Sequence, residues 1–147
     1  VFVCTGNVCR SPMAAGLLCA ALGSDSDWKV LSAGLSAVNG LPPSAEAAEV
    51  MAERGVDIGG HLSRRLDAEQ IDAATVIVVM TGAHRDQIEA LSPGARGKVF
   101  LLKTFAPGGE GDIEDPIGQP VEVYRRTRDE IKEAMPELVD FLSKLEL

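Results

Sequence analysis

The chain begins with an apolar run, Val1 to Val3, that is typical of a buried β-strand. A short turn containing Gly6-Asn7 follows, and Ser11-Pro12 then starts a stretch rich in apolar residues. Proline suits the first turn of a helix, because its missing N–H would have no partner there. We therefore expect a strand, a tight turn and a helix in immediate succession, with Ser11 or Arg10 at the helix cap.

This succession predicts an anion-binding loop, because the N–H groups of the turn and of the helix N-terminus converge on one point. Cys4 stands at the mouth of the loop, and Arg10 follows it after five intervening residues. A thiol is a poor nucleophile until it ionises, and N–H donors, a helix dipole and a guanidinium all favour the thiolate. The planar guanidinium of Arg10 also suits two phosphate oxygens at once. The hypothesis from these residues is that the loop holds a phosphate while Cys4 attacks it.

The rest of the chain alternates between expected strands and expected helices. The strands are expected at residues 30–33, 75–80 and 98–102, and the helices at 12–23, 45–54, 67–71, 82–91 and 121–145. A kink is expected in the last helix at Pro136. The alternation predicts one α/β domain over residues 1–147, with a doubly wound (flavodoxin-like), four-stranded parallel sheet and helices on both faces. Ligands of such folds bind beyond the carboxyl ends of the strands, which is where the Cys4 loop lies.

A long glycine-rich stretch, residues 106–118, follows the fourth expected strand and is too long to be a mere connection. It contains four acidic residues, of which Asp112, Glu114 and Asp115 are the candidate acids. The oxygen or nitrogen that leaves phosphorus needs a proton, and a mobile carboxylic acid is the usual source. We rank Asp115 above the other two because Pro116 stiffens the backbone after it, and we expect Asp115 also to activate the water that hydrolyses a thiophosphate.

The composition limits the classes of partner. The 147 residues carry a net charge of -8, which argues against nucleic acid and anionic membrane surfaces as main partners. The three cysteines form no CxxC pair, so we expect no zinc or other metal, no cofactor and no disulfide scaffold. A reduced, cytoplasmic setting and a monomer are expected, with no membrane span and no signal peptide. The chain lacks an initiator methionine and starts inside an expected strand, so a few further N-terminal residues are expected.

The segment from Cys4 to Pro12, CTGNVCRSP, resembles the signature loop of the low-molecular-weight protein tyrosine phosphatase family. The segments Ser32-Ala33-Gly34, Met80-Thr81 and Glu114-Asp115-Pro116 also match that family in order and spacing. The resemblance implies that Cys4 is the nucleophile, Arg10 the phosphate clamp and Asp115 the general acid, and that the substrate is a phosphorylated protein. It implies a phosphate loop made by Thr5, Gly6, Asn7, Val8, Cys9 and Ser11.

The same resemblance assigns supporting roles to four residues around the loop. It implies that Asn7, Ser36 and His61 hold the loop and its thiolate, and that Cys9 can form a reversible disulfide with Cys4. The residue itself leaves a plainer alternative open, in which Cys9 only fills space beneath the loop. His61 is expected to be a hydrogen-bonded structural residue even if it supports the loop.

Two segments depart from the tyrosine-directed members of the family, which usually carry aromatic residues there. They read Ile117-Gly118 after the Asp-Pro pair and Leu35 to Val38 after the second strand. A related bacterial branch, the protein-arginine phosphatases, has an acid loop like this one but typically places threonine where this chain has Val8. The apolar Val8 sides with the tyrosine enzymes, so we expect phosphotyrosine as the substrate, with phosphoarginine as the alternative.

Two other functions compete with these. Arsenate reduction on a similar scaffold needs further cysteines after the third strand, and residues 80–91 contain none. A non-catalytic phosphate-binding module has no need for Cys4, Arg10 and Asp115 together. Outside the site, Cys19 and Tyr124 are expected in the core, and His84 is expected to be exposed to solvent.

Overall fold

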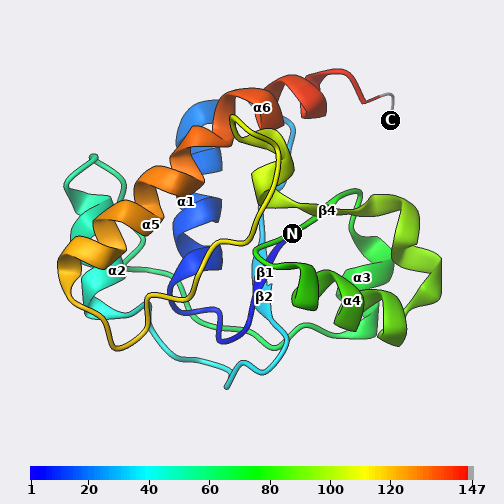
Figure 1. Ribbon diagram of the computed structural model, residues 1–147, viewed down its shortest axis with the longest axis horizontal. Helices are drawn as coiled ribbons and strands as arrows, with labels where there is room; N and C mark the ends of the chain where they lie inside the picture. Colours follow the sequence, from blue (N-terminus) through cyan, green and yellow to red (C-terminus); the bar gives the residue numbers. More distant parts are fainter. Residues whose placement is uncertain (146–147) are drawn as a thin grey trace.

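The structure, a computed structural model that describes residues 1–145, has the expected parallel sheet of four strands in the order β2-β1-β3-β4 (Figure 1). The last two residues of the expected domain, 146 and 147, lie outside the described part. The strands are β1 (Phe2–Cys4), β2 (Ser32–Gly34), β3 (Ile77–Val79) and β4 (Val99–Leu101). All three pairings are parallel, and β1 lies between β2 and β3. This is the doubly wound, flavodoxin-like order, so the predicted fold class is confirmed.

Helices cover both faces of the sheet (Figure 1). One face carries α1 (Arg10–Leu22), α2 (Ala45–Ala52), α5 (Val121–Glu133) and α6 (Met135–Ser143). The other face carries α3 (Ala68–Ala73), α4 (Gly82–Leu91) and the short 3-10 helix η1 (Pro93–Lys98). A second 3-10 helix, η2 (Leu102–Phe105), follows β4 and precedes the long loop. Within residues 1–145, no helix is both long and apolar enough to cross a lipid bilayer.

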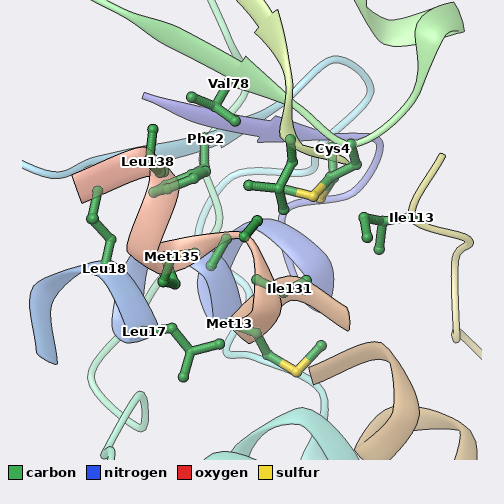
Figure 2. Close-up of a cluster of buried hydrophobic side chains, with 14 of the residues drawn as sticks. Phe2, Cys4, Met13, Leu17, Leu18, Val78, Ile113, Ile131, Met135 and Leu138 are labelled. Atoms are coloured by element: carbon green, nitrogen blue, oxygen red, sulfur yellow. The ribbon is translucent and has the colours of Figure 1, made fainter. Parts of the chain in front are cut away.

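The alternation of side chains along each strand divides the core between the two faces. Phe2 and Val78 point toward α1 and α6 and pack with residues such as Leu18 and Leu138 (Figure 2). Val3, which lies between Phe2 and Cys4 in β1, belongs to the smaller cluster of buried side chains on the other face of the sheet. Because β1 and β3 are buried on both faces, their sequences are apolar throughout, which is why the sequence predicts them clearly.

Cys4 occupies the last position of β1 and points to the same side as Phe2, over α1 (Figure 2). Its side chain therefore lies at the carboxyl edge of the sheet, directly where the loop to α1 begins. The fold thus places the predicted nucleophile at the rim where doubly wound proteins bind ligands.

The prediction of one kinked helix over residues 121–145 is wrong in its continuity. Helix α5 ends at Glu133, Ala134 caps it, and α6 begins at Met135. Pro136 lies in the first turn of α6, where its missing N–H costs nothing. Continuing α5 through this point would place the proline ring against the carbonyl of Lys132, so the helix ends there instead of bending.

Three smaller expectations about the first half of the chain are also corrected. Helix α1 is capped by Cys9, one residue before Arg10 and two before Ser11, so Arg10 already belongs to the helix. Strand β2 begins at Ser32, two residues later than expected, and extends to Gly34, one residue beyond the expected end. Cys19 is exposed, because the buried face of α1 is formed by Met13, Ala14, Leu17 and Leu18.

An ion-pair network joins α2 to α5. Glu53, at the end of α2, accepts hydrogen bonds from Arg125 Nε and Nη2 and, at 2.7 Å, from Arg128 Nη1. Arg128 is 2% exposed, and its Nη1 also donates to the carbonyl of Val50 at 2.9 Å. Hydrogen bonds from Arg125 and then Arg128 lower the pKa of Glu53 to about 2.

We expect this network to make stability depend on pH. The pKa of Glu53 is lower in the folded protein than its ordinary value of 4.5, so its contribution is fully present above that value and is lost as the pH falls toward 2. The substitution Glu53→Gln should lower the free energy of unfolding at pH 7, and the difference from the wild type should shrink through this pH range. Urea unfolding at several pH values measures it, with exposed Glu133→Gln as control. If the free energies of unfolding of the wild type and Glu53→Gln differ as much below pH 3 as at pH 7, the result contradicts this account.

Candidate active site

The loop between β1 and α1 surrounds the sulfur of Cys4, which is 2% exposed. Its Sγ accepts the backbone N–H of Asn7 at 3.3 Å and lies 2.9 Å from Oγ of Ser11, in the first turn of α1. Partial positive charge at a helix N-terminus and a backbone N–H both stabilise a thiolate. The arrangement is therefore suited to a nucleophilic sulfur beside a bound oxyanion.

Asn7 holds the loop in shape. Its φ angle is 58°, in the left-handed region that asparagine tolerates better than most residues, and it is fully buried. Its side-chain amide donates to Ser11 Oγ at 2.8 Å and to Ser32 Oγ at 3.0 Å, and its Oδ1 accepts the backbone N–H of Arg64 at 2.8 Å. Its backbone carbonyl lies 2.7 Å from Nε2 of His61. Asn7 thus connects the loop to α1, to β2 and to the segment before α3.

The residues expected to support the loop reach it in different ways. The His61 imidazole contacts the loop directly, as just described. Ser36 contacts it through the backbone only: its N–H donates to the carbonyl of Thr5 at 2.9 Å, while its side chain is exposed. The hydroxyl that binds Asn7 is that of Ser32, which sequence reasoning missed. The pairing of Ser32 with Phe2 in the parallel register of β1 and β2 brings this hydroxyl to the loop.

Arg10 lies where the loop between β1 and α1 ends and is 3% exposed. Its Nη1 donates to the carbonyl of Ile113 at 2.9 Å, and its Nη2 lies 3.6 Å from Oδ2 of Asp115. Its buried Nε has no hydrogen-bond partner among the described residues. The guanidinium is therefore held at one end by the acid loop and keeps a buried donor for an oxyanion.

The acid loop, residues 106–118, is anchored at Ile113 and at the adjacent Asp112. Ile113 N–H donates to the carbonyl of Met80 at 2.8 Å, and Asp112 Oδ1 accepts the N–H of Gly82 at 2.9 Å. Asp115 keeps a side chain that is 41% exposed and accepts the N–H of Ile117 at 3.1 Å. Among the candidate acids Asp112, Glu114 and Asp115, Asp115 is the one that forms an ion pair with Arg10.

Cys9 lies beneath the loop, 3% exposed and directed toward α5. Its Sγ is 3.4 Å from the hydroxyl of Tyr124 and 3.4 Å from Oγ of Ser44. Burial raises the pKa of the Cys9 thiol, and burial likewise raises the pKa of Tyr124. Tyr124 is in the core, as expected, and it also supplies a polar contact under the loop.

Gly34 lies so close to the loop that it has no room for a side chain. A Cβ on Gly34 would lie 2.6 Å from the carbonyl oxygen of Thr5 and 2.9 Å from the N of Asn7, and both atoms belong to the backbone. We expect Gly34→Ala to displace the loop and to lower phosphate affinity and kcat/KM by about a hundredfold. The control is Gly97→Ala, because a Cβ there meets nothing within 4 Å. Unchanged phosphate binding by Gly34→Ala, measured by calorimetry, contradicts this prediction.

In the described part of the chain, no group of three or more His, Cys, Asp or Glu residues is arranged to hold a metal ion. The chemistry that the site offers is that of its own side chains: a sulfur nucleophile, a guanidinium and a carboxyl group at the rim. These are the parts that phosphoryl transfer requires, since charge spreads over three equatorial oxygens and the leaving group needs a proton.

Several known proteins are similar to this chain over nearly its whole length. A protein-arginine-phosphatase of Geobacillus stearothermophilus is 44% identical over 142 residues, covering 97% of this chain and 94% of the relative. The crystal structure of a low molecular weight protein tyrosine phosphatase from T. tengcongensis has a TM-score of 0.87 and 41% identity, covering 95% of this chain and 96% of that one. Arsenate reductase 2 of Staphylococcus haemolyticus is 33% identical over 134 residues, covering 91% of this chain and 90% of the relative.

The sequence resemblance is confirmed by a family model as well as by these relatives. The model described as low molecular weight phosphotyrosine protein phosphatase matches residues 1–146. Family and relatives include protein phosphatases that differ in the phosphorylated residue named for them. The chain belongs to the low molecular weight phosphotyrosine protein phosphatase family.

Proposed function

We propose that this chain acts as one phosphatase domain in which Cys4 attacks the phosphorus of a phosphorylated protein side chain. The observation that carries the proposal is that Cys4 Sγ accepts the N–H of Asn7 at the start of the segment whose Arg10 guanidinium lies beside the carboxyl group of Asp115. We assign the loop residues Thr5, Gly6, Asn7, Val8, Cys9 and Ser11 to phosphate binding. Asn7, His61 and the backbone of Ser36 hold that loop in place.

Two chemical steps follow from this arrangement. In the first, the Cys4 thiolate forms an S–P bond, the P–O bond to the leaving group breaks, and Asp115 gives its proton to the leaving oxygen. In the second, Asp115, now a carboxylate, takes a proton from water, whose oxygen attacks phosphorus and releases phosphate and the thiolate. Arg10 and the loop N–H groups stabilise the charge on the equatorial oxygens in both steps.

We propose phosphotyrosine as the substrate. Val8 lies in the loop itself, and Ile117, two residues after Asp115, is 53% exposed. Apolar side chains at these two places offer contact area to a tyrosine ring, although no aromatic residue of this chain stacks on it there. Val8 has no hydroxyl group, so its side chain offers no hydrogen-bond partner to the guanidinium group of a phosphoarginine.

Phosphoarginine is the second candidate, because the acid loop is negatively charged. Asp112 and Glu114 flank the site beside Asp115, and a phosphorylated guanidinium group keeps N–H donors that carboxylates accept. The relative with 44% identity, a protein-arginine-phosphatase, supports the same alternative. The two candidate substrates differ in the residue that suits them at position 8: an apolar side chain suits phosphotyrosine, and a threonine hydroxyl suits phosphoarginine.

The substitution Val8→Thr tests this choice. We expect the wild type to prefer phosphotyrosine, and Val8→Thr to move the ratio of kcat/KM values toward phosphoarginine by about tenfold or more, because the phosphate loop then carries a hydroxyl at this position. Matched phosphotyrosine and phosphoarginine peptides measure it, with Val139→Thr on α6 as control. A wild type that is already faster on phosphoarginine contradicts the order proposed here.

Neither rival function fits the residues as well. We do not propose arsenate reduction for this chain, although one relative is an arsenate reductase, since residues 80–91 contain no cysteine that could carry away oxidising equivalents. A non-catalytic binding module binds phosphate but never turns over p-nitrophenyl phosphate, so an assay with this substrate distinguishes it from an enzyme.

We also infer a monomer in a reducing, cytoplasmic setting, which keeps Cys4 and Cys9 as free thiols. Light scattering of the purified protein tests whether it is a monomer.

A further inference from the structure

His84 is buried, although its place near the start of α4 predicts exposure. It is 5% exposed, and its backbone N–H is capped by Thr81 Oγ1 at 3.2 Å. Its Nε2 lies 2.9 Å from Oγ1 of Thr5, the first residue of the phosphate loop. The imidazole therefore joins the start of α4 to the loop after β1 at the carboxyl edge of the sheet.

The Thr5 hydroxyl has a second partner, Arg10, whose Nη2 lies 3.5 Å from Oγ1. A guanidinium can only donate, so Thr5 accepts from Arg10. In a neutral imidazole one ring nitrogen donates and the other accepts, so Nε2 pairs with the hydroxyl in either tautomer. The three side chains form one hydrogen-bonded row that ends at the buried imidazole.

The surroundings keep the imidazole uncharged. Burial first, and then the charge of Arg10, lower the pKa of His84 to about 4, against the opposing effects of Asp112 and Asp115. Nδ1 is buried with no hydrogen-bond partner among the described residues. A neutral imidazole suits this place, because it pairs with the Thr5 hydroxyl that contacts Arg10 without reducing the positive charge that an oxyanion needs.

We propose that His84 is a positioning residue that fixes the Thr5 hydroxyl and, through it, the guanidinium of Arg10. The inference rests on the proposed function of Arg10. When Asp115 carries the proton that it gives to the leaving group, it is uncharged and its attraction for Arg10 Nη2 is weak. The Thr5–His84 pair does not change charge in that step, so it keeps the guanidinium oriented while Asp115 changes its protonation state.

A double-mutant cycle on phosphate binding distinguishes this role from simple filling of space. The variants are Thr5→Val, which replaces the hydroxyl by a methyl group, His84→Leu and the double variant, with inorganic phosphate as the probe in calorimetry. We expect each single change to weaken binding about tenfold, and the double variant to be no weaker than the weaker single variant. An additive loss of about a hundredfold, or no loss in either single variant, overturns the proposal.

The conservative variants His84→Gln and Thr5→Ser supply the rescue arm, since each keeps a hydrogen-bonding group near the original position. Both should bind phosphate within about threefold of the wild type; a His84→Gln as weak as His84→Leu overturns the proposal. If His84→Leu does not fold, the cycle is run with His84→Phe, and the Thr5→Val to Thr5→Ser comparison still decides whether the hydroxyl matters.

A spectroscopic measurement needs no change at His84. The chain has two histidines, so NMR of isotope-labelled histidine resolves the two rings. We expect the His84 ring to stay neutral down to about pH 5 and Thr5→Val to shift its titration, whereas titration at the ordinary value of 6.5 contradicts the buried contact. Phosphate binding and ring titration do not require turnover, so a protein that binds phosphate but never hydrolyses a substrate refutes the proposed function alone.

Discussion

The substitution Cys4→Ser is expected to lower kcat for p-nitrophenyl phosphate by about ten-thousandfold or more and to leave phosphate binding intact. A serine hydroxyl in the same position does not ionise near neutral pH, so the attack on phosphorus is lost. The donors that hold the oxyanion, including the N–H of Asn7, are backbone groups or other side chains and stay in place. Steady-state kinetics and calorimetry with inorganic phosphate measure the two effects separately.

The exposed thiol of Cys19 provides the matched control. Cys19→Ser makes the same chemical change on the outer face of α1 and should leave kcat unchanged. A fall of less than about a hundredfold in Cys4→Ser contradicts the assignment of the nucleophile. Loss of phosphate binding together with activity points instead to a collapsed loop.

Arg10→Lys is expected to lower kcat/KM by about a thousandfold, although the charge is kept. Lysine is a point charge and cannot replace the planar fork whose Nη1 donates to the Ile113 carbonyl at 2.9 Å while Nε stays available. Because the interaction strengthens as charge develops on the phosphoryl oxygens, most of the loss should fall on kcat. Arg96→Lys, at an exposed position of η1, is the control. A loss below about tenfold would mean that the guanidinium geometry is not used.

The fold was largely predictable because its signals are local. Residues 75–80 are β-branched and apolar on both faces, as a central parallel strand should be, and helices with recognisable caps separate the strands. The element boundaries were less predictable: each strand here is three residues long, so flanking apolar residues resemble strand residues without belonging to one. The break at Ala134 puts Pro136 in the first turn of α6, whereas the helical pattern alone fits a kinked helix equally well.

The site was predictable where its residues are adjacent in the sequence. Cys4 and Arg10 belong to one loop, and their convergence follows from a strand, a turn and a helix cap. Ser32 and His84 were missed because their contacts with the loop join residues 25 and 79 positions apart. The exposure of Cys19 was missed because an apolar stretch that is rich in alanine does not show which side of the helix faces the core.

The most direct test is to trap the phosphoryl group on the enzyme. In Asp115→Asn, p-nitrophenyl phosphate has a leaving group good enough to depart without an acid, whereas hydrolysis of the thiophosphate lacks its base and stalls. We expect a labelled phosphoryl group, after rapid quenching in alkaline denaturant and proteolysis, on the peptide that contains Cys4. Label on a different peptide, or product formed with no labelled enzyme at any time, would contradict attack by Cys4.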